Sequence, residues 1–243
     1  MEQEINPDGN SYASRITLHV LLKSRLMAQS IWYKLILFAF HRLYNELAWT
    51  YDAVSWVVSL GDWRGWQRAA LSFLQGQTVL EIAHGPGHLL VEVNAAAYQT
   101  IGLDLSSAMG RLAQKNMRRA GVCIPLTRGN VQALPFAGEQ FDNVLSTFPA
   151  EFIAEMRTLQ EVWRVLRPRG QFIIVPEGHL TGRGPLFWLV DLLWRVTLRP
   201  RPTEELWQPF ITRMEQVGFA VTLHPVHLRR SGTTVIVARK KDS

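Results

Sequence analysis

The stretch Val79-Leu-Glu-Ile-Ala-His-Gly-Pro-Gly-His88 decides the fold of this chain. A short apolar run, typical of a buried strand, carries the acidic Glu81 and breaks into a glycine-rich turn. A helical pattern over residues 88–97 follows the turn. Gly85 and Gly87 let the backbone approach a ligand closely, and the start of the helix presents free N–H groups to an anion. Strand, turn and helix therefore predict a cradle for a nucleotide cofactor.

A second strand is predicted over residues 100–105, and it ends near Asp104. This carboxylate lies seventeen positions after Gly87, where it can accept hydrogen bonds from both ribose hydroxyls of a nucleoside. A helix is expected next, with Ser106 as its N-cap and Gly121 after its end.

The alternation of strands and helices continues toward the C-terminus. The pattern predicts strands over residues 122–127, 141–147 and 171–175. The helix before the last of these carries an apolar face and is closed by residues 167–170; the face consists of Leu159, Val162, Trp163 and Leu166. A helix capped by Thr203 and ended by Gly218, and strands over 219–228 and 232–238, are expected after it.

With these blocks in sequence order, the chain resembles a class I S-adenosylmethionine-dependent methyltransferase, of the ubiquinone/menaquinone-biosynthesis methyltransferase-like branch. Five blocks carry the resemblance: VLEIAHGPG from Val79, IGLDLSSAM from Ile101, RGNVQALPF from Arg128, FDNVLSTF from Phe141 and EVWRVLRPRGQFIIV from Glu161. A weaker block precedes them, with Tyr51-Asp52 and then Gly-Asp-Trp-Arg-Gly-Trp over residues 61–66.

The resemblance implies an α/β fold with a Rossmann-like, seven-stranded, mostly parallel sheet. Helices would cover both faces, and the C-terminal strand would run antiparallel. We expect the methyltransferase domain to occupy residues 44–243, with an apolar helical insertion at about 180–202. Residues 1–43 would form an N-terminal helical extension.

The resemblance also implies S-adenosyl-L-methionine as the cofactor and assigns its binding residues. Those expected around the methionine part and the cleft are Tyr51, Glu81, Ala83, His84, Gly85, Gly87 and Thr147. Asp104 would hold the ribose hydroxyls and Leu105 would pack on the adenine. Asn130 and Val131 would border the adenine edge.

Two of these positions depart from the family pattern. The family usually has Gly where this chain has Ala83, a change that is tolerable if the φ angle there is negative. The family often has Asp where this chain has Asn130, whose side-chain carbonyl can still accept a hydrogen bond from an adenine amino group. We therefore expect the cofactor to bind. A NAD-type Rossmann domain is the rival interpretation, but its third motif glycine is replaced here by Leu90.

No residue stands out as a catalytic base. Methyl transfer chiefly requires positioning of the acceptor, and a base is needed only if the acceptor must lose a proton. The weak candidates are His88, Glu177 and His179; His84, Glu151, Tyr44 and Tyr51 also belong near the expected cleft. Each of these residues is more often structural than catalytic. Tyr51 and Trp66 fit cleft residues better than catalysts.

The composition and motifs limit the kinds of partner that the protein is expected to bind. A net charge of +6 and a pI near 9.8 favour anionic partners, such as a membrane surface. Neither a nucleic-acid module nor a metal-ligand spacing is present in the sequence, and the Ser-Thr-Phe-Pro-Ala run over 146–150 lacks the Pro-Pro motif of DNA adenine methylases. The single cysteine, Cys123, is expected in the core of the third strand and fits a reducing, cytoplasmic setting.

Two apolar segments leave alternatives open. Residues 31–40 are too short and too charged to span a bilayer, so the N-terminal extension is expected to be either a lid over the cleft or an interfacial helix. Residues 185–198, with Trp188 and Trp194, would line an apolar substrate site, touch a membrane at the inner face, or pack against other residues.

The function expected from these observations is methyl transfer to a small, apolar acceptor such as a quinone precursor or a lipid. The alternative is a non-catalytic, membrane-associated protein that binds S-adenosylmethionine, because the cradle predicts binding rather than turnover.

Overall fold

The computed structural model describes residues 50–182, 184, 187–188, 190 and 204–241. Within them, an eight-stranded sheet has the order β3-β2-β1-β4-β5-β8-β6, and β7 pairs with β8 outside this path. The strands are β1 (Thr78–Ile82), β2 (Gln99–Asp104), β3 (Leu126–Arg128), β4 (Phe141–Thr147), β5 (Leu166–Val175), β6 (Gly178–Leu180), β7 (Phe219–His227) and β8 (Ser231–Lys240).

Strands β1 to β5 are parallel, and β8 runs antiparallel to its neighbours β5, β6 and β7. The β6 strand continues along the same edge of β8 that β5 occupies, while β7 covers the other edge over nine residues. The α/β fold and the antiparallel C-terminal strand expected from the sequence are therefore confirmed. The short β6 makes the sheet eight-stranded rather than seven-stranded.

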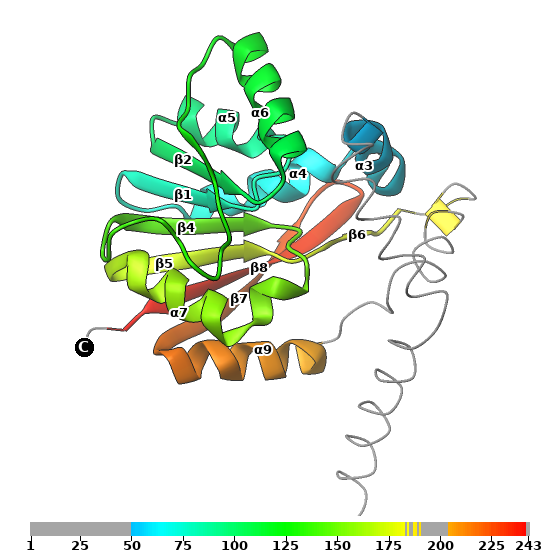
Figure 1. Cartoon of the computed structure of the whole chain (residues 1–243). Helices are drawn as coiled ribbons and strands as arrows, with labels where there is room; N and C mark the ends of the chain where they lie inside the picture. Colours follow the sequence, from blue (N-terminus) through cyan, green and yellow to red (C-terminus); the bar gives the residue numbers. More distant parts are fainter. Residues whose placement is uncertain (1–49, 183, 185–186, 189, 191–203, 242–243) are drawn as a thin grey trace, which may run out of the picture. The chain divides into compact units, whose positions relative to one another are not determined.

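Helices cover both faces of this sheet (Figure 1). They are α3 (Tyr51–Ser59), α4 (Trp63–Arg68), α5 (His88–Ala95), α6 (Ser107–Ala120), α7 (Met156–Val165) and α9 (Glu204–Val217), with short 3-10 turns η2 (Ala69–Phe73) and η3 (Glu151–Ala154). Side chains alternate across β1: Leu80 and Ile82 pack in the cluster with α7 and α9, whereas Val79 packs in the cluster with α5 and η2. Both clusters are buried, and Glu81 shares the α5 side with Val79 because the strand period is two.

The local signals set several element ends as predicted. Ser106 caps α6 through a hydrogen bond from the Met109 N–H to its Oγ (3.3 Å), and Gly121 ends the helix with φ 70°. Gly218, with φ 113°, follows the last residue of α9. Thr203, Trp194 and the N-terminal extension lie outside the described residues.

Other boundaries differ from the prediction. The third strand covers only residues 126–128 rather than 122–127, and Cys123 is exposed instead of lying in the core. Pro125 has no N–H for a ladder, so the strand begins after it. The fifth strand begins at Leu166 rather than at residue 171, so residues 167–170 belong to the strand; a register shift opposite Phe141 accommodates them. The helix predicted over 88–97 ends at Ala95.

Candidate functional site

The sheet places a site at the carboxyl ends of β1 and β4. These neighbouring parallel strands lie where the strand order reverses direction, and ligands of open α/β sheets bind in the crevice outside this point. Each strand is followed by a residue other than glycine in the left-handed region, Ala83 with φ 54° and Phe148 with φ 50°. Such strained backbone tends to gather at functional sites. Topology and strain therefore indicate the same edge.

The structure does not meet the condition of a negative φ under which Ala83 was expected to be tolerated, because φ there is 54°. The family's usual glycine adopts a positive φ without a steric penalty, whereas the Ala83 Cβ crowds the backbone there. The conformation is held by the Ala83 N–H, which donates to the Leu103 carbonyl at 2.7 Å. The chain thus keeps the shape of the turn at a cost in local strain.

The glycine-rich turn closes against the second strand. The Gly85 N–H donates to Asp104 Oδ2 at 2.9 Å, and the Gly87 N–H donates to the His84 carbonyl at 3.0 Å. Gly87, with φ 73°, precedes α5, and a Cβ there would lie 2.8 Å from the Cβ of Ala113. A Cβ on Gly85 would meet nothing within 4 Å. The open space lies at Gly85, while Gly87 is required by the packing of α6.

Asp104 joins the turn to α6, because its Oδ1 also accepts the Ser106 N–H at 2.8 Å. The next residue, Leu105, is 63% exposed, which is unusual for a large apolar side chain at the end of a buried strand. Asn130 is exposed and its Oδ1 accepts the Gln132 N–H at 3.0 Å, so part of its acceptor capacity serves the local turn. Val131 is buried in the main core cluster.

Glu81 is a buried carboxylate in this edge of the sheet. Its side chain is 1% exposed, and its Oε2 has no hydrogen-bond partner in the described part of the chain. Burial, and then the nearby Asp104 and Glu92 carboxylates, raise its pKa well above the usual value. His84 beside it is also buried, which lowers its pKa although Asp104 opposes the shift. An incoming cation would therefore find an unsatisfied carboxylate oxygen here.

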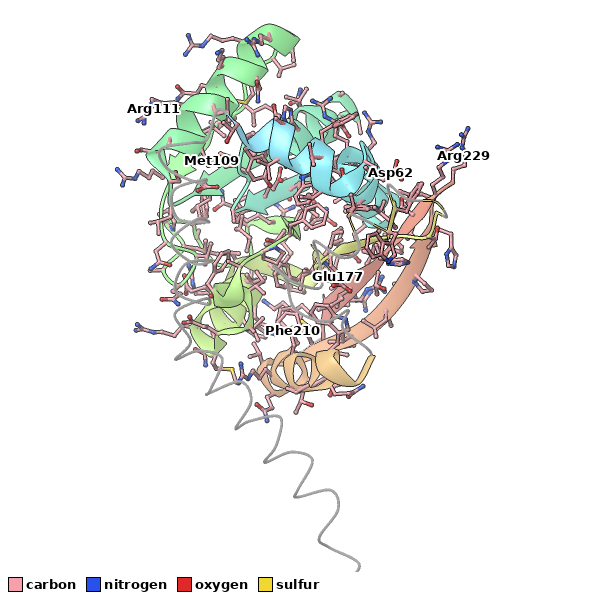
Figure 2. All side chains as sticks on the ribbon, turned by 90° about the vertical axis from the view of Figure 1, so that its right-hand side faces the viewer. Asp62, Met109, Arg111, Glu177, Phe210 and Arg229 are labelled. Atoms are coloured by element: carbon pink, nitrogen blue, oxygen red, sulfur yellow. The ribbon has the colours of Figure 1, made fainter. Side chains whose placement is uncertain are left out.

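Helices α3 and α4 form a cap at this edge, which we define as residues 51–68. Tyr51 and Trp63 pack in one cluster with Met109 in the first turn of α6. Figure 2 shows Met109 on α6 next to this cap. Trp63 also stacks on Phe148, with ring centroids 4.0 Å apart and an interplanar angle of 30°. The cap therefore spans from the end of β2 to the end of β4.

The cap is fixed to the far strands as well. Trp66 is fully buried, and its indole N–H donates to Ser231 Oγ at 3.0 Å. Its ring lies on Gly178, where an added Cβ would come within 2.0 Å of it. Thr147, predicted as a cofactor residue, accepts a hydrogen bond from the Gln67 amide at 3.1 Å. Both predicted cleft residues thus hold the cap on the sheet.

The described catalytic candidates come from different elements of the fold. His88 begins α5 and contacts Asp52 and Arg64 of the cap. Glu177 lies beyond the end of β5, as Figure 2 shows, and its carbonyl accepts the Thr233 hydroxyl. His179 belongs to β6 and faces Gly232. Glu151 begins η3, and Tyr44 lies outside the described residues. Within the described residues, His88 therefore lies in a different element from Glu177 and His179.

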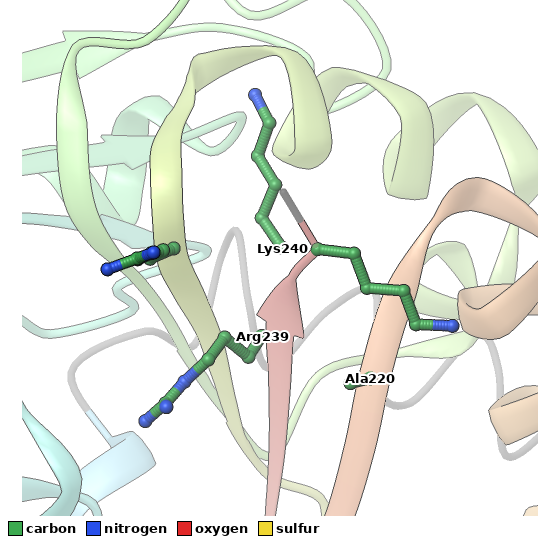
Figure 3. A pocket seen from close by; sticks show the side chains of 5 residues that line it. Ala220, Arg239 and Lys240 are labelled. Carbon is green, nitrogen blue, oxygen red and sulfur yellow. The ribbon is translucent and has the colours of Figure 1, made fainter. Parts of the chain in front are cut away.

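A shallow basic pocket lies at the opposite edge of the sheet (Figure 3). It has a volume of about 340 Å³ and is lined by Arg169, Ala220, Arg239, Lys240 and Lys241. These residues stand near the start of β7, the end of β8 and the amino-terminal half of β5. The pocket is thus separate from the glycine-rich turn. Among the described residues, no group of three or more His, Cys, Asp or Glu is placed to hold a metal ion.

The comparisons with known proteins agree with this geometry. Residues 79–170 match the family described as methyltransferase domain. This part of the chain is therefore similar to methyltransferase domains. A demethylmenaquinone methyltransferase from Symbiobacterium thermophilum is 34% identical over 141 residues, covering 54% of this chain and 56% of that protein. A ubiquinone/menaquinone biosynthesis C-methyltransferase UbiE from Citrobacter koseri is 28% identical over 142 residues, covering 55% and 57%. The methyltransferase domain thus resembles proteins of the quinone branch, although the chain spans little more than half the length of these relatives.

Solved structures support the fold of the methyltransferase domain. A SAM-dependent methyltransferase from Methanosarcina mazei superposes with a TM-score of 0.52 at 20% identity, covering 72% of this chain and 98% of that one. The [4+2]-cyclase SpnF superposes with a TM-score of 0.54 at 17% identity, covering 73% and 81%. The fold is therefore shared with a protein named for a different reaction, so the fold alone does not decide the chemistry.

Several residues of the site were not singled out from the sequence. Phe148 follows a strand that was recognised, but its left-handed backbone and its stacking on Trp63 are tertiary features. Asp52 and Arg64 lie within the weak sixth block, which therefore carried the signal for the cap. Their partner in α5, His88, could not be identified from sequence spacing, because it lies 24 positions from Arg64 and 36 positions from Asp52.

Proposed function

We propose that the chain is an S-adenosylmethionine-dependent methyltransferase of an apolar, quinone-type acceptor. The observation that carries this proposal is the unpartnered Glu81 oxygen in a cradle whose turn shape is kept even at the strained Ala83. S-adenosylmethionine carries an ammonium group and a sulfonium group, and a buried unpaired carboxylate suits a cation. The family match and the names of the relatives support the same reaction.

The residues at the turn fit the parts of this cofactor. Glu81 and the turn over residues 83–87 would hold the methionine part, with backbone N–H groups at the start of α5 facing its carboxylate. Asp104 would hold the ribose, although both of its oxygens already accept backbone N–H groups; a carboxylate oxygen has a second lone pair for this. The exposed Leu105 would pack on the adenine, beside Asn130.

The chemistry demands positioning above all. When bound, the cofactor supplies a methyl group that its sulfonium has already activated. The residues of the site would have to hold the acceptor with its attacking atom facing this methyl group. The stacked Trp63 and Phe148 stand at the end of β4 and offer aromatic faces to a planar ring. The name of the UbiE relative, a C-methyltransferase, supports a ring carbon as the methylated atom.

Contact with an anionic membrane surface is part of this proposal. Helix α3 buries Tyr51, Ser55 and Ser59, and exposes its apolar side chains to solvent: Val54 (41%), Trp56 (64%) and Val57 (50%). The tip of the β7–β8 hairpin carries exposed Arg229 and Arg230; Figure 2 shows Arg229 there, and the neighbouring Leu228 approaches α4 at Gly65. Apolar and basic groups side by side suit an interfacial site at the inner face of a membrane.

Helices that span the bilayer are not needed for this contact. None of the described helices is long and apolar enough to cross a membrane. Flotation with vesicles containing anionic lipid should therefore carry the wild-type chain, and Trp56→Ser with Val57→Ser should reduce the floated fraction. A deletion of residues 1–43 tests the N-terminal segment in the same assay. Flotation that survives both changes would contradict a membrane role for either region.

The decisive experiment is label transfer. The chain would be incubated with methyl-labelled S-adenosylmethionine and a short-chain demethylmenaquinol, and the organic phase counted. Label in the recovered quinone supports the proposal. Cofactor binding without label in this acceptor or in lipid extracts would favour the non-catalytic binding protein instead. Absence of cofactor binding would overturn both interpretations.

Asp104→Ala tests the cofactor site in the same protein. We expect it to weaken cofactor binding by about 2 kcal/mol, the scale of hydrogen bonds to a charged group, as measured by calorimetry. Asp62, the N-cap residue of α4 whose side chain makes no capping hydrogen bond, provides the matched control as Asp62→Ala. An unchanged affinity in the Asp104 variant contradicts the ribose assignment.

A further inference from the structure

The ring of His88 joins the cap to the start of α5. Its Nε2 lies 2.8 Å from Asp52 Oδ1 in α3, and its Nδ1 lies 3.2 Å from a terminal guanidinium nitrogen of Arg64 in α4. A guanidinium has donors only, so Nδ1 must be the acceptor in this pair. Nε2 then carries the proton and donates to the Asp52 carboxylate. The two partners thus fix one tautomer of a neutral ring.

This arrangement removes His88 from the catalytic candidates. A general base needs a free ring nitrogen, whereas both nitrogens of His88 are engaged by the cap. The hydrogen bond from His88 lowers the pKa of Asp52, although burial opposes the shift, and the charges of Arg64 and Arg119 lower it further. Asp52 therefore stays ionised and holds the ring. The network connects three helices through one imidazole.

The position of His88 places the network next to the glycine-rich turn. His88 is the first residue of α5 and follows directly on Gly87, so it is fixed to the turn that forms the cradle. Tyr51 and Trp63 attach the same cap to α6 and to Phe148. The ring of His88 is therefore the contact between the cap and α5 that lies next to the turn.

We propose that His88 is a positioning residue that couples closure of the cap to occupation of the cofactor cradle. This inference rests on the proposed function, because it takes the turn over residues 83–87 to be the cofactor site. His88 acts through Asp52 and Arg64. The cap and the cofactor therefore stabilise each other, and loss of the imidazole weakens cofactor binding without removing a group of the cradle.

Three substitutions separate the two halves of the network. His88→Gln places an amide N–H near the position of Nε2 and can keep the Asp52 contact, whereas His88→Asn places an amide oxygen near Nδ1 and can keep the Arg64 contact. His88→Ala removes both. The matched control is Arg68→Ala, which breaks the Arg68–Glu92 ion pair (2.7 Å) between the end of α4 and α5, away from the turn.

Calorimetry with S-adenosylmethionine and S-adenosylhomocysteine measures the coupling. We expect His88→Ala to weaken cofactor binding about tenfold, on the scale of allosteric couplings, the Asn and Gln variants about threefold each, and Arg68→Ala to leave it unchanged. Hydrogen exchange of α3 amides gives a second readout. Cofactor should slow exchange in the wild type and in Arg68→Ala, and fail to do so in His88→Ala.

The outcomes distinguish this inference from the proposed function. If the wild type binds no cofactor, the proposed function itself fails. If the wild type binds cofactor and the His88 variants bind it equally well, with α3 protected to the same degree, the coupling is overturned while the cradle stands. If His88→Ala and Arg68→Ala lower the melting temperature and the affinity alike, His88 is merely structural and the inference fails.

Discussion

The polar side chains at the two edges of the parallel sheet differ in how completely they are hydrogen-bonded. At the amino-terminal edge, Asp142 accepts the Gln77 N–H, the Thr78 N–H and the Thr78 hydroxyl at 2.8–2.9 Å, and pairs with Arg167 at 2.9 Å. Asn143 exchanges hydrogen bonds with the backbone of Gln75 in both directions. At the carboxyl-terminal edge, Glu81 keeps an unpartnered oxygen.

Backbone strain follows the same division. The left-handed residues Glu139 and Arg169 near the amino-terminal edge are exposed, Glu139 in a turn and Arg169 in the first half of β5. Ala83 and Phe148 at the other edge are partly buried in packed surroundings. The comparison teaches that the polar groups of one edge are paired in a way that favours stability, whereas the other edge keeps an unpartnered carboxyl oxygen and strained backbone, as ligand sites often do.

Glu81→Gln should give the largest effect and separates the two edges most sharply. Removal of the charge should weaken binding of S-adenosylmethionine by roughly 3 kcal/mol, on the order of 100-fold. The cofactor-free protein should become more stable at neutral pH, because burial raises the pKa of Glu81 and ionisation there opposes folding. Calorimetry and denaturant unfolding check the two signs. A loss of both affinity and stability would place Glu81 with the structural groups.

Asp142→Asn should show the reverse pattern. Burial opposes ionisation of Asp142, but the N–H of Gln77, Arg167 and Thr78 outweigh it and lower the pKa from 3.8 to about 2. The substitution should reduce the free energy of unfolding by about 2 kcal/mol, with unchanged cofactor affinity. The lowered pKa stabilises the fold above pH 3.8, and this contribution is lost as the pH falls through about 2. The variant should lack that part of the acid transition in a pH series of unfolding curves.

The pH dependence of cofactor binding tests the role of Glu81 without any substitution at the amino-terminal edge. Since the pKa of Glu81 is raised in the free protein, a cationic cofactor should bind with release of a proton. Affinity should rise with pH by up to about tenfold per unit, and become constant above the pKa of the free protein. Calorimetry in buffers of different ionisation enthalpy counts the released proton. The Glu81→Gln variant should show neither the slope nor the proton.

Ala83→Gly should give the smallest effect. Relief of the left-handed strain should raise the free energy of unfolding by about 1 kcal/mol, less a part lost to the greater freedom of glycine in the unfolded chain. Gly85→Ala, also at a positive φ but with open space around its Cβ, is the companion change and should lower stability by a similar amount. If Ala83→Gly destabilises the protein, its Cβ contributes packing that outweighs the strain.

Much of the fold could be predicted from the sequence, because strand and helix periodicity and capping signals act locally. The strand before Glu81, the carboxylate of Asp104 and the caps of α6 all follow from short patterns. The prediction extended the third strand through Pro125, whose missing N–H prevents ladder pairing before Leu126, and Cys123 was consequently misplaced. The long fifth strand depends on a register shift against β4.

The site was less accessible to prediction than the fold. Family positions supplied the cofactor residues, yet the sign of φ at Ala83 depends on its hydrogen bond to Leu103 in the neighbouring strand. The engagement of His88 depends on two helices that arrive from earlier in the chain. Sequence spacing can suggest such residues as candidates. Their role depends on the groups that contact them in the folded protein.

The hydrogen bond between Trp66 and Ser231 has a consequence for synthesis of the protein on the ribosome. The two residues are separated by 165 positions, and Ser231 begins the strand that covers the edge of β5. Until β8 has emerged, a nascent chain therefore carries an open strand edge and an anchoring tryptophan without its partner. The cap residues are synthesised early, but the hydrogen bond from Trp66 to Ser231 can form only after residue 231 has been synthesised. Chaperones that bind apolar surface should consequently associate with nascent chains that end before residue 231 and release those that extend beyond residue 240.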